Sequence, residues 1–336
     1  MFLPIKFMAS HSSYGHAILS GFDYLLSNYD EVFLLGQGLW SPWYVGNSMT
    51  DLDKKFGTHR VIDTPVSESA CTAAALGAGL TGMKPVVVHP RMDFMLYALD
   101  AVVNQASKWS HMFGGQLPPN LTIRSIINRG GEHGAQHSQS LHSWFSHIPG
   151  LRVVMPSTVQ DAQDLLVASV LSPDPVLYID DRGLYEHTSS LNPVTSVLDL
   201  KDVAPVVLRQ GNDISLVASS YSTYLAIQAA DLLQSAGISC EVIDLRVINP
   251  LDADVLLTSV AKTRRLLVVD GGWSPCGLSS EIMALVCESG VMSTFLSPPQ
   301  RVTLPFAPAP TSRVLEKIYY PDVDLVVRRI REVLQH

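Results

Sequence analysis

Along most of the chain, short apolar runs rich in β-branched residues alternate with longer segments whose apolar positions recur at helical spacing. A parallel sheet with helices on both faces produces this alternation, because its strands are buried on both sides. The pattern therefore predicts an α/β fold. In the N-terminal half the predicted strands are EVFLLGQG, PVVVHP, LTIRSIIN, LRVVMP and PVLYID, and the predicted helices cover residues 12–28, 51–56, 93–113, 135–145 and 158–171.

The alternation is interrupted near the middle of the chain and then resumes. We interpret residues 1–188 as a first domain, 189–204 as a linker and 205–336 as a second, smaller α/β domain. The second domain is predicted to contain the strands ISLVAS, CEVIDLRVI, RLLVVD and VTLP, helices over 221–235, 252–260 and 278–288, and a last helix after a proline-rich stretch.

The stretch Arg60–Gly82 joins a short β-branched run to an alanine-rich helix and carries one acid at the junction. Ser67 is suited to cap the helix, and Glu68 then falls in its first turn. An acid there has a purely structural explanation, because carboxylates stabilise helix N-termini by a few tenths to about 1 kcal/mol. The helix has no polar face, however, so we expect it to be buried all round. A carboxyl group at the mouth of a buried helix favours a functional role.

Three glycines at the end of this helix, Gly77, Gly79 and Gly82, match the spacing GxGxxG. A dinucleotide-binding loop needs its glycines between a strand and the start of a helix. These glycines follow a helix and precede a strand, so we interpret them as close packing and a helix C-cap.

Four histidines lie between positions 133 and 147. The spacing of His133 and His137 fits a metal-binding helix, but Gly134 lies between them and no acid does, so this interpretation is the weaker one. We expect a helix from about Ala135, with His137 in its first turn, where the positive end of the dipole favours the neutral imidazole. Such a histidine suits proton transfer or hydrogen bonding to an oxyanion. A histidine satisfied in the core explains the spacing equally well.

Composition narrows the classes of function. Hydrophobic residues make up 47% of the 336 positions and charged residues 16%, so we expect other subunits to cover part of the surface. The net charge of −8 argues against a nucleic acid partner. The four cysteines form no CxxC pair, which suits a reducing compartment. No apolar run reaches the roughly 18 residues of a membrane span and no signal peptide pattern is present, so we expect a cytoplasmic protein without a membrane partner.

The segments VFLLG, RVIDTPVSE, MDF, GAQHSQS, SHIPGLRVVMPS and GGW resemble the β subunit of the E1 component of 2-oxo acid dehydrogenases, of the pyruvate and branched-chain type. The resemblance continues through EVIDLRVINPLD and LPFAPAPTSRVLEKIYYP, so it covers both predicted domains. It implies a thiamine-diphosphate-binding, parallel-sheet pyrimidine domain followed by a transketolase C-terminal domain. It also implies decarboxylation of a 2-oxo acid such as pyruvate, with transfer of the acyl group to a lipoyl-bearing E2 protein.

The resemblance also implies roles for single residues. Glu68 matches the glutamate that activates the aminopyrimidine ring of thiamine diphosphate, Phe94 the aromatic residue that stacks on this ring, and His137 a catalytic histidine that assists acyl transfer. Gln37 stands at a cofactor-site position where the family usually has glutamate, which leaves proton exchange between two thiamine sites in doubt. Arg91 is a second departure. A cation there favours an anionic or phosphorylated substrate, although a solvated or salt-bridged arginine is the simpler explanation.

The diphosphate and Mg²⁺ of the cofactor have no recognisable binding motif in this chain. The usual GDG sequence followed by an asparagine is absent, and Asp270-Gly271-Gly272 does not replace it. The resemblance therefore implies an E1 α subunit that holds both groups, in an α₂β₂ heterotetramer with a contact between the two β chains. It also implies a structural K⁺ ion at the backbone carbonyls of Leu121, Ser169, Ser172 and Asp174.

Two other functions stay open at this point. The first is a split transketolase-like subunit, or another non-oxidative thiamine-dependent ketol or acyl transferase, which Gln37 and Arg91 keep open. The second is a non-catalytic assembly subunit. The presence of Glu68, Phe94 and His137 together argues against the second.

Overall fold

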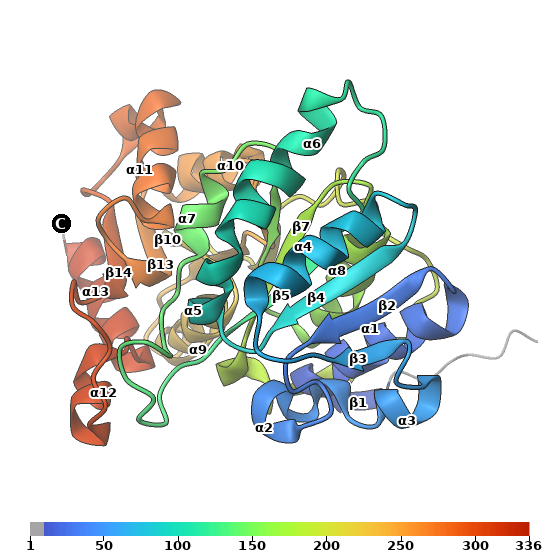
Figure 1. Ribbon diagram of the computed structural model, residues 1–336. Helices are drawn as coiled ribbons and strands as arrows, with labels where there is room; N and C mark the ends of the chain where they lie inside the picture. The colour runs from blue at the N-terminus through green and yellow to red at the C-terminus, as the bar shows by residue number, and fades with distance from the viewer. Residues whose placement is uncertain (1–9, 336) are drawn as a thin grey trace, which may run out of the picture.

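The computed structural model describes residues 10–335, so residues 1–9 of the predicted first domain lie outside the described part. A seven-stranded sheet organises the N-terminal half, in the order β12-β6-β7-β5-β4-β2-β3 (Figure 1). Its strands pair in parallel except β12, which runs antiparallel to β6. The strands are β2 (Val32–Gly36), β3 (Val61–Asp63), β4 (Lys84–His89), β5 (Thr122–Ile127), β6 (Arg152–Val154), β7 (Val176–Asp181) and β12 (Val247–Asn249).

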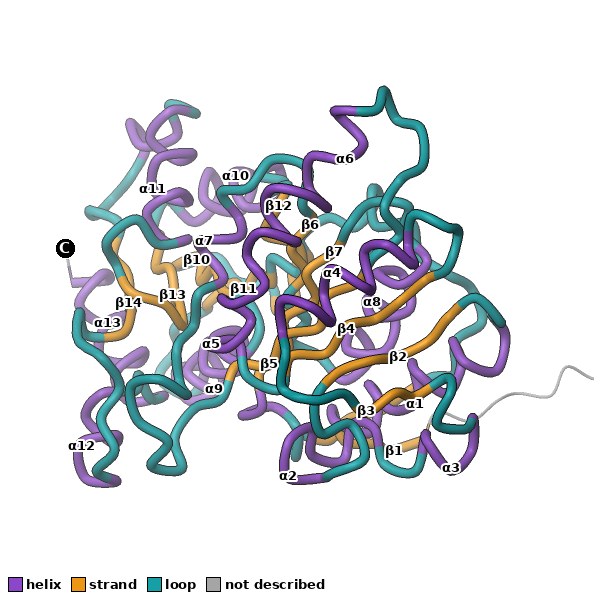
Figure 2. The backbone as a smooth tube through the Cα atoms, viewed as in Figure 1, coloured by secondary structure: helices purple, strands orange, loops and turns teal. Residues whose placement is uncertain are grey.

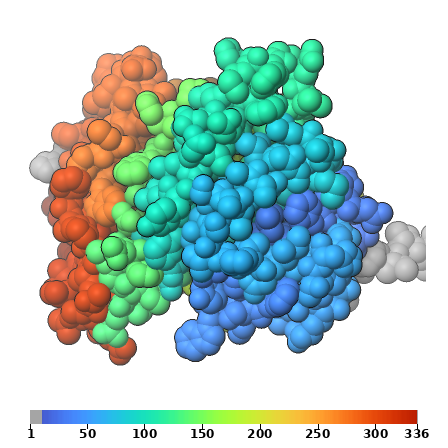
Figure 3. Space-filling model, in the orientation of Figure 1, coloured from blue at the N-terminus to red at the C-terminus, as the bar shows by residue number. Residues whose placement is uncertain are grey.

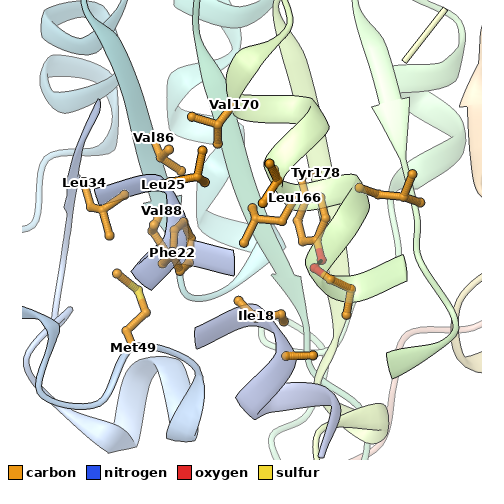
Figure 4. Packing of buried hydrophobic residues seen from close by; sticks show 14 of the residues in the cluster. Ile18, Phe22, Leu25, Leu34, Met49, Val86, Val88, Leu166, Val170 and Tyr178 are labelled. Atoms are coloured by element: carbon orange, nitrogen blue, oxygen red, sulfur yellow. Dashed lines mark hydrogen bonds between the residues drawn. The ribbon is translucent and has the colours of Figure 1, made fainter. Parts of the chain in front are cut away.

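One face of this sheet is covered by α1 (Tyr14–Asn28) and α8 (Val159–Leu171). Helix α1 begins two residues after the predicted start at residue 12. The hydroxyl groups of Ser13 and Thr158 cap the two helices by accepting hydrogen bonds from backbone N–H groups in the first turn. Figure 4 shows Phe22 and Leu166 of the two helices packed with Val88 and Tyr178 of the sheet. Burying these side chains supplies the main stabilisation of this layer.

The other face is covered by α4 (Glu68–Gly79) and by a segmented helix. The long helix predicted over 93–113 is a series of pieces: α5 (Met92–Met95), the 3₁₀ turn η2 (Leu96–Ala98), the π-helical η3 (Asp100–Ala106) and α6 (Ser107–Met112). Figure 2 shows α6 and the loop after it projecting beyond the sheet. Shorter segments fill the other connections: α2 (Pro42–Val45), η1 (Gly46–Met49), α3 (Leu52–Phe56), α7 (His142–Ser146) and η4 (Arg182–Leu184).

A five-stranded sheet organises the C-terminal half, in the order β14-β13-β10-β11-β9. Its strands are β9 (Val206–Arg209), β10 (Ile214–Ala218), β11 (Cys240–Asp244), β13 (Leu266–Trp273) and β14 (Gln300–Leu304), and β9 alone among them pairs antiparallel. Four longer helices and two short ones complete this half: α9 (Tyr221–Gln234), α10 (Asp254–Thr263), α11 (Leu278–Glu288), η5 (Val291–Thr294), α12 (Arg313–Tyr319) and α13 (Val323–Gln335).

The two halves share a core. Leu256 and Ile282, from α10 and α11, belong to the same buried cluster as Met92 and Ile123 of the first half. In the space-filling view the orange and red surface of the C-terminal half lies directly against the green segments of the first half (Figure 3). The α/β fold expected from the sequence is confirmed.

One predicted strand needs correction, and the predicted linker over 189–204 stays a prediction. The stretch CEVIDLRVI, predicted as one strand, forms β11 of the second sheet and β12 of the first. Arg246 lies between them with φ of 60°, and its Nη2 donates to Asp161 Oδ1 at 2.7 Å, so the chain turns sharply at this residue. The stretch predicted as a linker overlaps β8 (Thr188–Leu191), which pairs antiparallel with β1 (Ser10–Ser13). No helix among residues 10–335 is long and apolar enough to cross a membrane.

Candidate active site

A cavity of about 670 Å³ opens at the carboxyl ends of β2 and β4. This is the edge at which open parallel sheets bind their ligands, and the volume lies in the range of about 300–1,000 Å³ common for small-molecule sites. Gln37, Glu68, Phe94 and His137 all line the cavity. The structure therefore brings together four side chains that the sequence spreads over a hundred positions.

Glu68 is the first residue of α4 and faces the cavity. Ser67 precedes the helix, but its side chain makes no capping hydrogen bond, so the predicted cap is wrong in that detail. The expectation that α4 is buried all round is also wrong for the single chain. Ala70, Ala73 and Gly77 form part of a solvent-exposed face, because none of residues 10–335 covers that side of α4.

Phe94 lies in α5 and meets the ring of His137 edge to face, with ring centroids 5.2 Å apart and an interplanar angle of 85°. The helix predicted over 135–145 is wrong: α7 begins only at His142, and His137 lies in a loop. Helix α5 holds this loop from outside, because Asp93 Oδ1 accepts hydrogen bonds from the backbone N–H of Gln139 at 3.2 Å and from its Nε2 at 3.0 Å. These tertiary bonds replace the helical ones, and no helix dipole acts on His137.

Gln37 directly follows β2, in a turn fixed by a 2.6 Å hydrogen bond from the backbone N–H of Gly38 to Asp63 Oδ1. Gly36 is required before it, because a Cβ atom there would lie 2.4 Å from the carbonyl oxygen of Val88. The end of β2 thus lies against β4, which carries the next wall of the cavity.

His89 ends β4 and is buried in the cavity wall, with Nε2 at 3.2 Å from Thr72 Oγ1. Burial lowers the pKa of His89 to about 4, so its ring is neutral at pH 7. The hydrogen bond to Thr72 ties the end of β4 to α4, the helix that begins with Glu68.

Two arginines border the cavity. Arg91 lines it and is partly buried, with Nη1 buried and without a hydrogen-bond partner. Arg182, which the sequence analysis missed, donates to the carbonyl oxygens of Tyr44 at 3.1 Å and Pro42 at 3.3 Å. It therefore fixes the loop that carries Tyr44 into the cavity wall. Its position directly after β7, at the same edge of the sheet, is the sequence signal that would have found it.

Two metal sites were considered from the sequence, one at His133 and His137 and one for K⁺, and neither coincides with the cavity. No helix joins His133 and His137, and residues 10–335 contain no group of three or more histidine, cysteine, aspartate or glutamate side chains that could hold a metal ion. The carbonyl of Leu121 accepts a backbone hydrogen bond from Val176 at 2.9 Å, and that of Ser169 accepts one from Thr122 Oγ1 at 3.1 Å. These residues, with Ser172 and Asp174, do not line the cavity. The K⁺ site stays a prediction.

Comparison with known families matches both halves of the chain. Residues 11–188 match the transketolase pyrimidine binding domain, and residues 204–326 match the transketolase C-terminal domain.

Curated relatives span most of the chain. The β subunit of acetoin:2,6-dichlorophenolindophenol oxidoreductase from Bacillus subtilis is 38% identical over 84% of this chain and 82% of the relative. The mitochondrial pyruvate dehydrogenase E1 component subunit beta from Saccharomyces cerevisiae is 35% identical over 91% of this chain and 84% of the relative. The human protein of the same name is 32% identical over 95% and 89%.

A solved structure described as a split gene transketolase, an inactive beta4 tetramer, superposes with a TM-score of 0.71 and covers 96% of each chain. Its sequence identity of 19% supports the fold alone.

Proposed function

Since this chain belongs to the transketolase-like family of β subunits that includes those of pyruvate dehydrogenase E1 and acetoin oxidoreductase, we propose that it is the β subunit of a thiamine-diphosphate-dependent 2-oxo acid dehydrogenase. In this role it would decarboxylate a 2-oxo acid such as pyruvate and pass the acyl group to a lipoyl-bearing E2 protein. The observation that supports the proposal most strongly is the convergence of Glu68, Phe94 and His137 on one cavity.

The residues around the cavity fit the aminopyrimidine half of thiamine diphosphate. Glu68 supplies a carboxyl group at one wall, Phe94 an aromatic face, and Val66, Val87 and Val88 apolar surface. An aminopyrimidine needs this combination, because its ring nitrogen forms a hydrogen bond while its faces are apolar. When bound, the cofactor supplies carbanion chemistry, with its thiazolium ring as the electron sink.

Each of these side chains has a role that follows from its chemistry. Glu68 would share a proton with a ring nitrogen of the pyrimidine and so favour the tautomer that acts as a base. Phe94 would stack on the ring and keep water from its face. His137, which Phe94 contacts, would orient the reacting group and move a proton during acyl transfer. Gln37 lines the cavity where the resemblance implies glutamate, so it would offer a ligand a neutral amide in place of a carboxylate.

The other half of the cofactor requires a second chain in this proposal. The carboxylates, histidines and cysteines of residues 10–335 form no cluster able to bind a metal ion, so the diphosphate and Mg²⁺ would be held by an α subunit. We propose an α₂β₂ heterotetramer in which two β chains also meet. The uncovered face of α4, next to Glu68, is consistent with a neighbouring subunit there. The K⁺ ion at Leu121, Ser169, Ser172 and Asp174 is part of the same proposal.

A second candidate is a split transketolase-like or other non-oxidative ketol or acyl transferase subunit. Arg91 is the observation that favours it, because sugar phosphates carry an anion and pyruvate loses its only anionic group as CO₂. Both candidates use the same cavity and the same Glu68.

The test is co-expression and reconstitution with an E1 α-type chain from the same organism. The complex is assayed with pyruvate, branched-chain 2-oxo acids and sugar phosphates, each with an artificial electron acceptor and with lipoylated E2 domain. Thiamine-dependent oxidation of a 2-oxo acid with reductive acylation of the lipoyl group supports the first candidate. Ketol transfer without reduction of any acceptor supports the second. A complex that binds no thiamine diphosphate contradicts both.

A further inference from the structure

Arg91 differs from the arginines around it because its side chain makes no hydrogen bond or ion pair with any of residues 10–335. Arg129 is paired with Asp181, and Arg124 is paired with Asp180 at 2.8 Å. Arg182 donates hydrogen bonds to backbone carbonyl groups. The ion pairs within residues 10–335 involve other cations, and Arg91 Nη1 is buried without a hydrogen bond. A guanidinium nitrogen that is buried without a partner is costly, and Arg91 carries its own in a cavity wall, so the arrangement points to a ligand.

The acid beside Arg91 does not neutralise it. Asp93 Oδ1 is occupied by the two hydrogen bonds from Gln139, which hold the His137 loop. Its other oxygen, Oδ2, is buried without a partner and makes no ion pair with the guanidinium group. Burial raises the pKa of Asp93, which weakens its tendency to carry the compensating charge.

Arg91 lies between a second cation and the acid Asp93. Burial lowers the pKa of Arg91 and the charge of Arg182 lowers it further, whereas the charge of Asp93 raises it, and the net shift is downward. Partial burial lowers the pKa of His133, followed by the charges of Arg91, His137 and Arg182. Arg91 and Arg182 are thus two cations from separate segments beside the cavity. An anionic ligand there would offset their mutual repulsion.

The carboxylate of a 2-oxo acid donor is a poor explanation for this arrangement. That group leaves as CO₂, and its negative charge moves away from the carboxylate oxygens in the transition state. A guanidinium group bonded to it would stabilise the bound substrate more than the transition state and would slow the reaction. An anion that persists from substrate to product carries no such penalty.

We propose that Arg91 is a specificity residue for an anionic group that the substrate keeps through the reaction, either a phosphate or a second carboxylate. The proposal rests on the proposed thiamine-dependent function of the same cavity. The planar guanidinium group can bind two oxygens of either anion at once, so both belong to the same chemical class. The group can be on the donor or on the acceptor, and the substrates chosen below separate these sources.

The experiment compares matched substrates in the reconstituted, cofactor-loaded complex. As donors, 2-oxoglutarate is compared with 2-oxobutanoate, and as acceptors, glyceraldehyde 3-phosphate is compared with glyceraldehyde. The variants are Arg91→Leu, which removes the charge, and Arg91→Lys, which keeps it but loses the paired geometry. Arg328→Leu is the control, because Arg328 is an exposed arginine of α13 outside the cavity.

In wild type we expect a higher kcat/KM for the anionic member of one pair. Arg91→Leu should lower this preference by about 10- to 100-fold, Arg91→Lys by less, and Arg328→Leu should leave it unchanged. The pair that responds identifies donor or acceptor as the source. The proposal is overturned if wild type and Arg91→Leu show the same preference for the anionic substrate. It is also overturned if Arg91→Leu only weakens association with the α chain and leaves this preference unchanged.

A binding measurement keeps this test separate from the proposed function. Calorimetry with inorganic phosphate and with malonate, on the cofactor-loaded complex, should give a dissociation constant at least about 10-fold higher in Arg91→Leu than in Arg328→Leu. If the complex performs thiamine chemistry but binds both probes equally in the two variants, the inference about Arg91 falls and the function stands. If probe binding depends on Arg91 while no thiamine chemistry occurs, the proposed function falls and the anion site stands.

Discussion

The two parallel sheets of this chain end differently at their carboxyl edges. At the first sheet, polar side chains after the strands face a cavity: Glu68, Arg91 and His137 line it, and Arg91 has a buried nitrogen without a partner. At the second sheet the corresponding acids are buried and hydrogen-bonded within the protein. Asp270 of β13 accepts hydrogen bonds from His142 Nε2 at 3.0 Å and from two backbone N–H groups, and Asp244 at the end of β11 accepts from Ser157 and Thr223.

This difference distinguishes a ligand site from a structural contact between the two halves of the chain. Polar groups that the protein leaves unpaired at a sheet edge are available to a ligand, whereas fully paired groups hold elements together. His142 comes from the first half and Asp270 from the second, so their hydrogen bond joins the halves. Burial would raise the pKa of Asp270, but the charge and hydrogen bond of His142 and the backbone N–H groups overcome it and hold the pKa below its usual range. Asp270 is therefore a carboxylate in the folded protein at pH 7.

If the open edge holds only the pyrimidine half of the cofactor, the isolated chain should bind thiamine diphosphate weakly. We expect a dissociation constant at least about 10³-fold higher than that of the α–β complex, because several charge-assisted bonds to the diphosphate and Mg²⁺ are missing. Calorimetry with and without Mg²⁺ measures both. Tight, Mg²⁺-dependent binding to the single chain would show that the open edge is complete by itself.

If the polar groups at the edge of the second sheet hold the two halves together, removing Asp270 should lower the stability of the chain. Asp270→Ala leaves His142 buried without its acceptor, and we expect the free energy of unfolding to fall by about 3 kcal/mol. Urea unfolding of the purified chain measures this. Asp324→Ala, at an exposed acid of α13, should change it by less than about 0.5 kcal/mol. Equal effects of the two variants would remove the distinction drawn between paired and exposed acids.

Asp244, the second of these acids, makes the stability of the chain depend on pH. Burial raises the pKa of Asp244 to about 7, so between pH 4 and 7 the folded chain keeps a proton that the unfolded chain releases. Its contribution to stability is therefore present at low pH and is lost as the pH rises through about 7.

Asp244→Asn cannot lose this proton, so its unfolding free energy relative to wild type should rise between pH 5 and 8, on the order of 2 kcal/mol. Urea unfolding at several pH values measures the difference, with Asp324→Asn as the control. A constant difference across this range would show that Asp244 does not titrate in it.

Two glycines in the last turn of α4, the helix that begins with Glu68, give the smallest expected effect. A Cβ on Gly79 would lie 2.7 Å from the carbonyl oxygen of Asn120, whereas one on Gly77 would meet nothing within 4 Å. In the purified chain we expect Gly79→Ala to lower the unfolding free energy by about 1 to 2 kcal/mol and Gly77→Ala to raise it by about 0.5 to 1 kcal/mol. Loss of stability in both would mean that the face of α4 at Gly77 is covered in this chain.

The sequence predicts most of the first sheet because its strands are continuous apolar runs, a pattern that needs no knowledge of neighbours. It also predicts Glu68, Phe94 and His137 as neighbours, through motifs that resemble one family. It fails where distant residues decide the local structure. The segment before His142 forms no helix because Asp93 binds Gln139, and Val247–Asn249 leaves the second sheet to pair with β6.

Partner-dependent features are beyond the sequence for another reason. The apolar composition of α4 indicates burial, but it does not tell which chain buries the helix, and in the single chain Ala73 and Gly77 remain exposed. Likewise, no local pattern reveals that Asp93 binds Gln139 and makes no ion pair with Arg91.

We propose that Glu68 activates the aminopyrimidine of thiamine diphosphate, and hydrogen–deuterium exchange at C2 of the bound cofactor measures this activation. In the reconstituted complex, Glu68→Gln keeps the size of the side chain but removes the acid. We expect the exchange rate to fall by at least about 10²-fold, the scale of a positioned acid–base group, with little change in melting temperature. Unchanged exchange together with a lowered melting temperature would contradict the claim and leave Glu68 as a helix-stabilising acid.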